Sequence, residues 1–447
     1  MPHRPASEQP VSTNLNRTIF ILALPALGAL LAEPLFVLAD TAIIGRLGTS
    51  ELAGLSLAAT ALMTVVGLCI FLAYATTAMV GRLLGAGDTH AAYRSGIGGL
   101  WLAAGLGALL ALGLSLGAPQ IIHLLGADAT TAPHAISYLR WSAPGLPGML
   151  LVLAATGVLR GKQDTRTPLV VAAVGLFANV VLNYVLVYPC GLGIAGSGLG
   201  SSLCQLTMGG YLARRVLQYA REAGVSWRPQ PSGITHNIRL GFPLLLRSVS
   251  LRLAILLTVW VATAQGETSL AAHQVVTSLW NLAAFILDAL AIAAQALISN
   301  ALGAGLQARV RAILNRCLWW GVVAGAGIGL VFLGAGTWFS GLFSPDPQVI
   351  EVTRNALVIA GIAMPLAGWV FVLDGVLIGA GDGNYLARAG IWTLVAYLPV
   401  AWGIHLYAPD AGAGLTLLWV GFAGYFMAAR ALATGWRALR HEQWLHN

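Results

Sequence analysis

Long apolar runs separated by short polar breaks dominate the hydropathy pattern of this 447-residue chain. An α-helix needs about 20 mostly apolar residues to cross a bilayer, where only helices and closed barrels satisfy their own backbone hydrogen bonds. The pattern predicts twelve such helices, over residues 18–44, 51–84, 95–124, 133–160, 167–188, 194–218, 238–264, 269–302, 309–343, 349–379, 385–407 and 412–436. The predicted fold class is therefore an all-α, multi-pass integral membrane protein.

Composition and charge support this class. Hydrophobic residues make up 57% of the chain and charged residues only 9%, against about 25% charged in an average soluble domain. With a cytoplasmic N-terminus, nineteen of the 24 Lys and Arg residues fall on the cytoplasmic side, and only Arg46, Arg140 and Arg354 fall outside. We expect both termini in the cytoplasm and the chain in a bacterial inner membrane. The net charge of +8 then reflects contact with anionic membrane lipids, and no nucleic-acid partner is expected.

Motifs of the main enzyme classes do not match. The only lysine, Lys162, is followed by Gln163, so there is no Walker loop for ATP. The string from His441 to His446 has one residue too many for a zinc-protease HExxH motif. The four cysteines, which are expected to be free thiols, show no CxxC spacing: Cys69, Cys190, Cys204 and Cys317. We expect no enzyme activity, no metal and no cofactor.

An internal repeat relates the two halves of the chain at an offset of 218 residues. Residues 47–87 align without a gap on residues 265–305, and the same offset carries Pro25 onto Pro243 and Pro147 onto Pro365. Six spans in each half give the halves the same orientation in the membrane. We predict an N-terminal lobe over residues 1–225, a cytoplasmic linker over 226–237, and a C-terminal lobe over 238–447. Parallel repeats of this kind are typical of transport by alternating access.

Two carboxylates lie inside the first apolar run. Glu33 and Asp40 are seven residues apart, which returns to within about 20° of the same helix face. A carboxylate at membrane depth costs about 3 kcal/mol or more, so such residues are rare and are functional candidates by default. Alternatively, they only pair with basic residues of another helix to hold the bundle together.

Several motifs resemble those of the multidrug and toxic compound extrusion (MATE) transporters, and within them the DinF-type branch. They are ADTAIIGRLG at residues 39–48, LGAGD at 84–88, RGKQDTRTPL at 160–169 and VLDGVLIGAGD at 372–382. The resemblance covers essentially all twelve spans. It implies a V-shaped fold of two six-helix lobes, and efflux of organic compounds driven by inward H⁺ or Na⁺.

The resemblance also implies roles for single residues. Asp40 matches the first-helix aspartate that the family is thought to protonate, and Glu33 matches an acidic position beside it in DinF-like members. Asn179 matches a fifth-helix asparagine that lines the cavity of the same lobe. Asn183 stands where relatives often carry an aspartate, which makes a Na⁺ site there less expected. Asp374 matches an acid of the tenth helix.

The eighth span carries a polar stripe with a period of seven residues: Gln274, Asn281, Asp288 and Gln295. On the seventh span, Arg247 and Arg252 are candidate partners for Asp288, Asp374 or Glu33. These side chains are predicted to line a substrate cavity and to exchange ion pairs between states. A static structural network is the alternative for the arginines, as interhelical hydrogen bonding is for the two asparagines.

Together these features predict a monomeric secondary transporter that exports small organic compounds, with lipophilic cations as the expected substrates. Burial and a neighbouring carboxylate both disfavour the charged form of an acid, so a proton and a cationic compound would compete at Asp40 and Glu33. Two alternatives stay open. One is Na⁺ in place of H⁺ as the coupling ion, and the other is a lipid-linked oligosaccharide flippase of the same superfamily.

Overall fold

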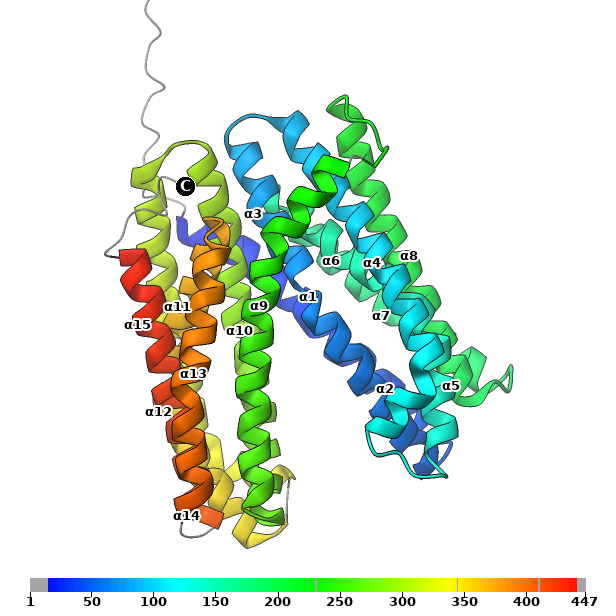
Figure 1. The fold of residues 1–447 in the computed structure, drawn as a ribbon, viewed down its shortest axis with the longest axis vertical. Coiled ribbons are helices and arrows are strands. Elements are labelled where there is room, and N and C mark those ends of the chain that lie inside the picture. The colour runs from blue at the N-terminus through cyan, green and yellow to red at the C-terminus, as the bar shows by residue number, and fades with distance from the viewer. Residues whose placement is uncertain (1–14, 230, 344, 409–410, 440–447) are drawn as a thin grey trace, which may run out of the picture. The chain divides into compact units, whose positions relative to one another are not determined.

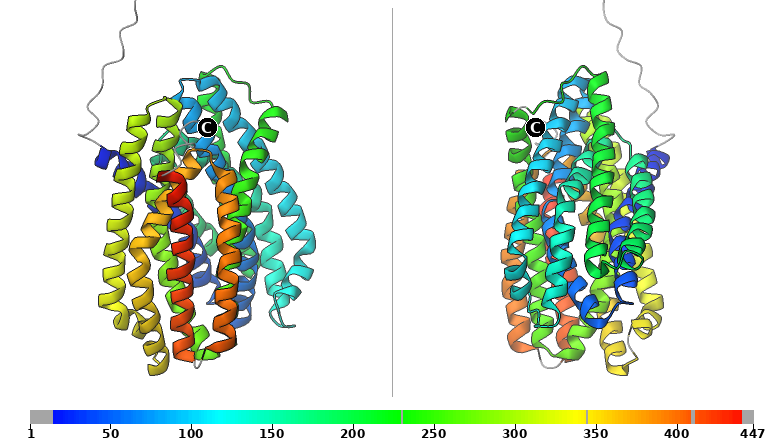
Figure 2. Two further views of the ribbon diagram at one scale, coloured as in Figure 1. Left: turned by 60° about the vertical axis from the view of Figure 1, so that its left-hand side comes forward. Right: turned by 90° about the vertical axis from the view of Figure 1, so that its right-hand side faces the viewer.

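The computed structural model describes residues 15–229, 231–343, 345–408 and 411–439, so Arg4, Arg440 and the string from His441 to His446 lie outside the described residues. The described elements are helices, with no strand among them (Figures 1 and 2). In chain order they are α1 (Leu15–Ile44), α2 (Thr49–Leu68), α3 (Phe71–Gly85), α4 (Thr89–Leu124), α5 (Ala132–Ser142), η1 (Ala143–Gly145), α6 (Leu146–Gly161), α7 (Arg166–Val187), α8 (Gly193–Glu222), α9 (Pro231–Ala264), α10 (Glu267–Gly303), α11 (Gln307–Phe343), α12 (Pro347–Gly379), α13 (Gly383–Tyr407), α14 (Ala411–Trp419), η2 (Val420–Phe426) and α15 (Met427–Leu439).

The helices match the predicted spans closely. Eleven helical stretches of the described chain are long and apolar enough to cross a membrane. The remaining predicted span, residues 194–218, corresponds to α8, whose Gly, Ser and Gln residues make it less apolar than the others. Three spans are interrupted: α2 and α3 meet at Cys69 and Ile70, η1 joins α5 to α6, and the π-helix η2 lies between α14 and α15. The prediction of an all-α membrane protein is confirmed.

The chain forms two compact units. We call the first the N-terminal unit (Pro25–Ser250 and Gly383–Arg388) and the second the C-terminal unit (Met1–Leu24, Leu251–Asp382 and Ala389–Asn447). They differ from the predicted lobes because α1 and α9 each contribute to both. At the start of α1, Asn16 Oδ1 accepts a hydrogen bond of 3.0 Å from Trp320 Nε1 of the C-terminal unit. Contacts of this kind assign the first turns of α1 to the unit formed mainly by the second half of the chain.

The predicted linker at residues 226–237 is partly helical, because α9 begins at Pro231 rather than at residue 238. Within the N-terminal unit, Asn237 Nδ2 donates to the Ser95 carbonyl of α4 at 3.1 Å and to the Gly233 carbonyl at 2.9 Å. Asn237 is buried by this contact. The side-chain bond to α4 explains why a segment that is polar in sequence continues as the start of a long helix.

Close helix packing in the N-terminal unit depends on small residues. A Cβ added at Gly148 of α6 would lie 2.4 Å from the Gln205 carbonyl oxygen of α8, and one at Gly209 would lie 2.4 Å from the Gly148 carbonyl oxygen. Glycine lets the two backbones approach closely, as small residues do at helix interfaces in membranes. The polar face of α8 is thereby fixed next to α6 and α7.

Candidate functional site

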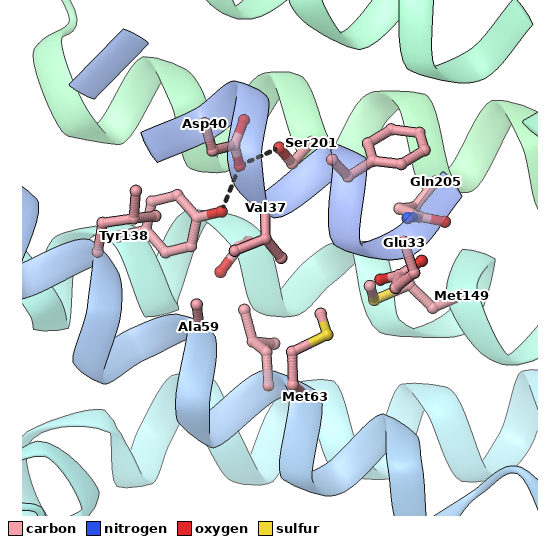
Figure 3. A pocket seen from close by; sticks show the side chains of 13 residues that line it. Glu33, Val37, Asp40, Ala59, Met63, Tyr138, Met149, Ser201 and Gln205 are labelled. Atoms are coloured by element: carbon pink, nitrogen blue, oxygen red, sulfur yellow. Dashed lines mark hydrogen bonds between the residues drawn. The ribbon is translucent and has the colours of Figure 1, made fainter. Parts of the chain in front are cut away.

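Asp40 lies near the end of α1 and is hydrogen-bonded to three other helices of the N-terminal unit. Its Oδ2 accepts hydrogen bonds from Tyr138 Oη of α5 at 2.8 Å and from Ser201 Oγ of α8 at 3.1 Å (Figure 3). Its Oδ1 accepts a hydrogen bond from Asn183 Nδ2 of α7 at 2.5 Å. Only 4% of Asp40 is exposed. This single carboxylate therefore joins α1 to α5, α7 and α8.

The two asparagines of α7 complete the polar cluster. Asn179 Nδ2 donates to Ser201 Oγ at 3.0 Å, and Asn183 Nδ2 lies 3.2 Å from the same oxygen and 3.4 Å from Ser197 Oγ. Both asparagines are completely buried. Among the described residues, the Oδ1 atom of each has no hydrogen-bond partner. Neither asparagine is among the residues that line the cavity next to Asp40. Their bonds to α8 and, for Asn183, to α1 are interhelical hydrogen bonds, as the alternative interpretation has it.

Gly200 makes this arrangement sterically possible. A Cβ at Gly200 would lie only 2.0 Å from Asn183 Oδ1, closer than nonbonded atoms approach. The helix α8 can therefore come near enough for Ser197 and Ser201 to meet Asn183 only because position 200 lacks a side chain.

Glu33 shares a cavity with Asp40, as the seven-residue spacing predicts. The cavity is lined by apolar and polar side chains of α1, α2, α5, α6 and α8: Glu33, Phe36, Val37, Asp40, Leu55, Ala59, Leu62, Met63, Tyr138, Ser142, Met149, Ser201 and Gln205. Figure 3 places Glu33 near Gln205 and Met149, away from the Tyr138 hydroxyl. Glu33 is partly exposed. Its carboxylate makes no side-chain hydrogen bond in the part of the chain that the structure describes.

The cavity can hold small species but not a whole organic compound in this state. It leaves about 40 Å³ of room for the centres of water-sized molecules, where one water needs about 10–15 Å³ on the same measure. Two carboxylates, three hydroxyls and the Gln205 amide line the cavity together with apolar side chains, which suits binding of a proton or a cation. No cluster of three or more His, Cys, Asp and Glu side chains able to hold a metal occurs among the described residues.

Asp374, which the sequence offers as one candidate partner of Arg247 and Arg252, forms an ion pair with Arg430. Asp374 lies on α12 and Arg430 on α15, and both are at least nine-tenths buried. The sequence places Arg430 near the cytoplasmic end of the last span. The helix α15 continues to Leu439, however, so Arg430 lies within the helix and can reach α12. Two helix turns further on, Arg437 Nε donates to Asp382 Oδ2 at 2.6 Å.

The polar stripe of α10 passes through different surroundings. Gln274 and Asn281 are exposed, Asp288 is half-buried, and Gln295 is buried at 1% exposure. A Cβ added at Gly379 of α12 would lie 2.6 Å from the Gln295 carbonyl oxygen, so this end of the stripe is packed against another helix. On α9, Arg247 is half-buried and Arg252 is exposed. The stripe therefore does not present one continuous exposed face.

Sequence reasoning missed five polar side chains of the cavity and its cluster: Tyr138, Ser142, Ser197, Ser201 and Gln205. The signal for three of them is the low hydropathy of the segment GSGLGSSLCQL at residues 196–206, which supplies Ser197, Ser201 and Gln205 from neighbouring turns of α8. Tyr138 stands alone in its segment, and only the fold brings it to Asp40.

Comparison with known proteins gives the family. The family model MatE matches residues 25–185 and again residues 243–402, which together are more than half of the chain. The chain belongs to the MatE family. The two matches begin at Pro25 and Pro243, at the offset of the internal repeat.

Relatives of this MatE protein match it over nearly its whole length. Protein DETOXIFICATION 44, chloroplastic, of Arabidopsis thaliana is 30% identical over 97% of this chain and 84% of its own. DNA damage-inducible protein F of Escherichia coli K12 is 28% identical over 95% of this chain and 93% of its own. The crystal structure of the Vibrio cholerae MATE transporter VcmN in the bent form shares the fold, with a TM-score of 0.86, 23% identity and 98% coverage of both chains.

The resemblance to MATE transporters is thus confirmed, and with it the fold of two six-helix lobes. The protein is a multi-pass membrane transporter of the MATE multidrug efflux family and not an enzyme.

Proposed function

We infer that this MATE transporter exports small organic compounds, chiefly lipophilic cations, across the bacterial inner membrane in exchange for protons. The observation that carries the proposal is the asymmetric set of hydrogen bonds at Asp40. Both partners of Oδ2 are hydroxyls, Tyr138 and Ser201, whereas the partner of Oδ1 is the amide nitrogen of Asn183.

This asymmetry favours Oδ2 as the oxygen of Asp40 that takes up the proton. A hydroxyl can turn to accept a hydrogen bond, but an amide NH₂ group only donates. A proton on Oδ2 can therefore be donated to Tyr138 Oη or Ser201 Oγ while Asn183 keeps its bond to Oδ1. Protonation at Oδ2 changes the bonds from α1 to α5 and α8, and it removes the negative charge that a bound cation would neutralise.

The cavity wall supports a role in binding varied organic compounds. Met63 and Met149 are flexible and polarizable side chains that adapt to ligands of different shape. The Glu33 carboxylate adds negative charge at the far end of the cavity. Pro34 lies between the two acids within α1 and removes one backbone hydrogen bond, so α1 can bend there and widen the cavity.

The test is efflux of rhodamine 6G from proteoliposomes that hold the purified protein, driven either by a pH gradient or by a Na⁺ gradient. We expect the pH gradient alone to drive transport, and Asp40→Asn to abolish it. Asp128→Asn is the matched control, since Asp128 lies in the exposed loop before α5, where hydrogen bonds from Thr131 and Thr130 keep the pKa of its carboxyl below the usual range.

Other results would favour the alternatives. Transport driven by Na⁺ alone would overturn proton coupling. If neither gradient moves rhodamine 6G through the wild-type protein, the efflux proposal fails, and lipid-linked oligosaccharides become the substrates to test.

A further inference from the structure

A second pocket lies wholly within the C-terminal unit and has aromatic walls. It is lined by residues of α9, α10, α14 and η2: Ile255, Thr258, His273, Thr277, Trp280, Asn281, Leu418, Trp419 and Phe422. We call it the aromatic pocket. None of its lining residues carries a carboxylate, so its chemistry differs from that of the Asp40 cavity.

Three of the aromatic rings form a connected wall. The ring centroids of Trp280 and Trp419 are 5.6 Å apart, those of Trp280 and Phe422 are 5.7 Å apart, and those of Trp419 and Phe422 are 5.8 Å apart at 88°. The His273 ring lies 5.8 Å from Trp419. Rings at these separations favour edge-to-face and offset contacts, and a further planar ring can join them in the same way.

The backbone is irregular at this wall. The π-helix η2 begins at Val420, directly after Trp419, and includes Phe422. Short π-helical turns are rare and often occur at functional sites. In this protein the π-helix begins between Trp419 and Phe422, and both of these side chains line the pocket.

Two buried polar atoms of the lining residues lack partners. Trp419 and His273 are each 2% exposed, and within the described residues Trp419 Nε1 and His273 Nδ1 have no hydrogen-bond partner. The other ring nitrogen of His273, Nε2, lies 3.3 Å from Thr277 Oγ1. Because nearly all buried polar groups in native proteins are hydrogen-bonded, unpartnered ones in a pocket wall point to a missing ligand or water.

We propose that the aromatic pocket is a second ligand site, which binds a planar aromatic ring bearing a hydrogen-bond acceptor on its edge. The ring packs against Trp280 and Phe422, and the acceptor takes the hydrogen bond of Trp419 Nε1, which can only donate. Aryl ketones, amides and heteroaromatic nitrogens supply such an acceptor. This inference rests on the proposed export of organic compounds and names a chemical class of substrate.

The small size of the pocket suits a ligand whose acceptor group enters the pocket while its ring stays outside. The pocket has about 20 Å³ of room for the centres of water-sized molecules, which suffices for one water or one acceptor group. A whole aromatic ring does not fit in this room, so the ring lies at the open mouth and only its acceptor group enters the pocket.

The test is equilibrium dialysis of the detergent-purified full chain against two cations, 1-methylquinolinium and 6-acetyl-1-methylquinolinium, which differ in one acceptor group. Trp419→Phe keeps an aromatic ring but removes the N–H donor. We expect it to weaken binding of the acetyl compound about threefold to tenfold, as loss of one hydrogen bond does, and to leave binding of the parent cation unchanged. Trp280→Leu should weaken binding of both.

Trp260→Phe is the matched control, because Trp260 stacks on Trp402 in the same unit, with centroids 5.8 Å apart, and does not line the pocket. Equal effects of Trp419→Phe on the two cations, or the same losses in Trp260→Phe, would overturn the proposal. So would failure of the wild-type protein to bind either cation. Dialysis involves no gradient, so these results are independent of whether protons drive transport.

A labelling experiment covers the case in which Trp419→Phe folds poorly. Asn281 lines the pocket and is exposed, whereas Gln274 on the same helix is exposed but does not line it. In a Cys190→Ser background, the acetyl compound should slow maleimide labelling of Asn281→Cys at least threefold and leave that of Gln274→Cys unchanged. Equal labelling with and without the compound would count against the site.

Discussion

Gly200→Ala should disturb the Asp40 site without changing any group that hydrogen-bonds to it. The new Cβ would lie 2.0 Å from Asn183 Oδ1, and ordinary contact begins at about 3.4 Å. Asn183 must therefore move by more than an ångström, which breaks the 2.5 Å hydrogen bond from its Nδ2 to Asp40 Oδ1. A hydrogen bond to a charged group contributes about 1.5–3 kcal/mol.

We expect Gly200→Ala to lower the free energy of unfolding by about this amount and to slow proton-driven efflux severalfold. Gly210→Ala on the same helix is the matched control, because no atom lies within 4 Å of a Cβ at that position. The assays are thermal melting of the purified protein and rhodamine 6G efflux from proteoliposomes.

A double-mutant cycle with Asn183→Ala isolates the cause. If Gly200→Ala acts through Asn183, most of its effect disappears in the Asn183→Ala background, which is the non-additivity expected of residues in contact. Additive effects of the two substitutions would refute this reasoning. So would a Gly200→Ala protein that melts and transports like Gly210→Ala.

Two further predictions concern the packing of each unit. Arg430→Met leaves the Asp374 carboxylate buried without the ion pair to Arg430. We expect this variant to lower the free energy of unfolding by about 3–5 kcal/mol. The double variant Asp374→Leu/Arg430→Met should recover most of that loss, because it removes the buried charge as well. Melting temperatures check this, and a double variant as unstable as the single one would contradict it. Gly148→Ala places a Cβ 2.4 Å from the Gln205 backbone, which cannot move aside, so the yield of folded protein in size-exclusion chromatography should fall severalfold. Gly105→Ala, with no atom within 4 Å of its Cβ, should match the wild type in the same measurement.

The sequence predicts what depends on neighbouring residues. Apolar runs give the helices, and the repeat gives the two matching halves, because both are patterns along the chain. Glu33 and Asp40 share a cavity because their spacing fixes them on one face of α1. The same reasoning works less well for α8, whose Ser and Gly residues lower its hydropathy because they serve helix packing and the polar cluster.

Contacts between distant residues were beyond sequence reasoning. Tyr138 and Ser201 are 98 and 161 residues from Asp40, and nothing in the local pattern pairs them with it. Asp374 forms an ion pair with Arg430, 56 residues away, because pairing between distant residues depends on which helices pack together. The aromatic pocket likewise joins His273 of α10 to Trp419 of α14.

The central claim is that a proton and a cationic compound exclude each other at Asp40. Its most direct test is proton release when tetraphenylphosphonium is added to the detergent-purified protein in weakly buffered solution near neutral pH. We expect the wild-type protein to release protons as it binds the cation, and Asp40→Asn to bind the cation with no release. Binding without proton release by the wild-type protein, or equal release by Asp40→Asn, would contradict it.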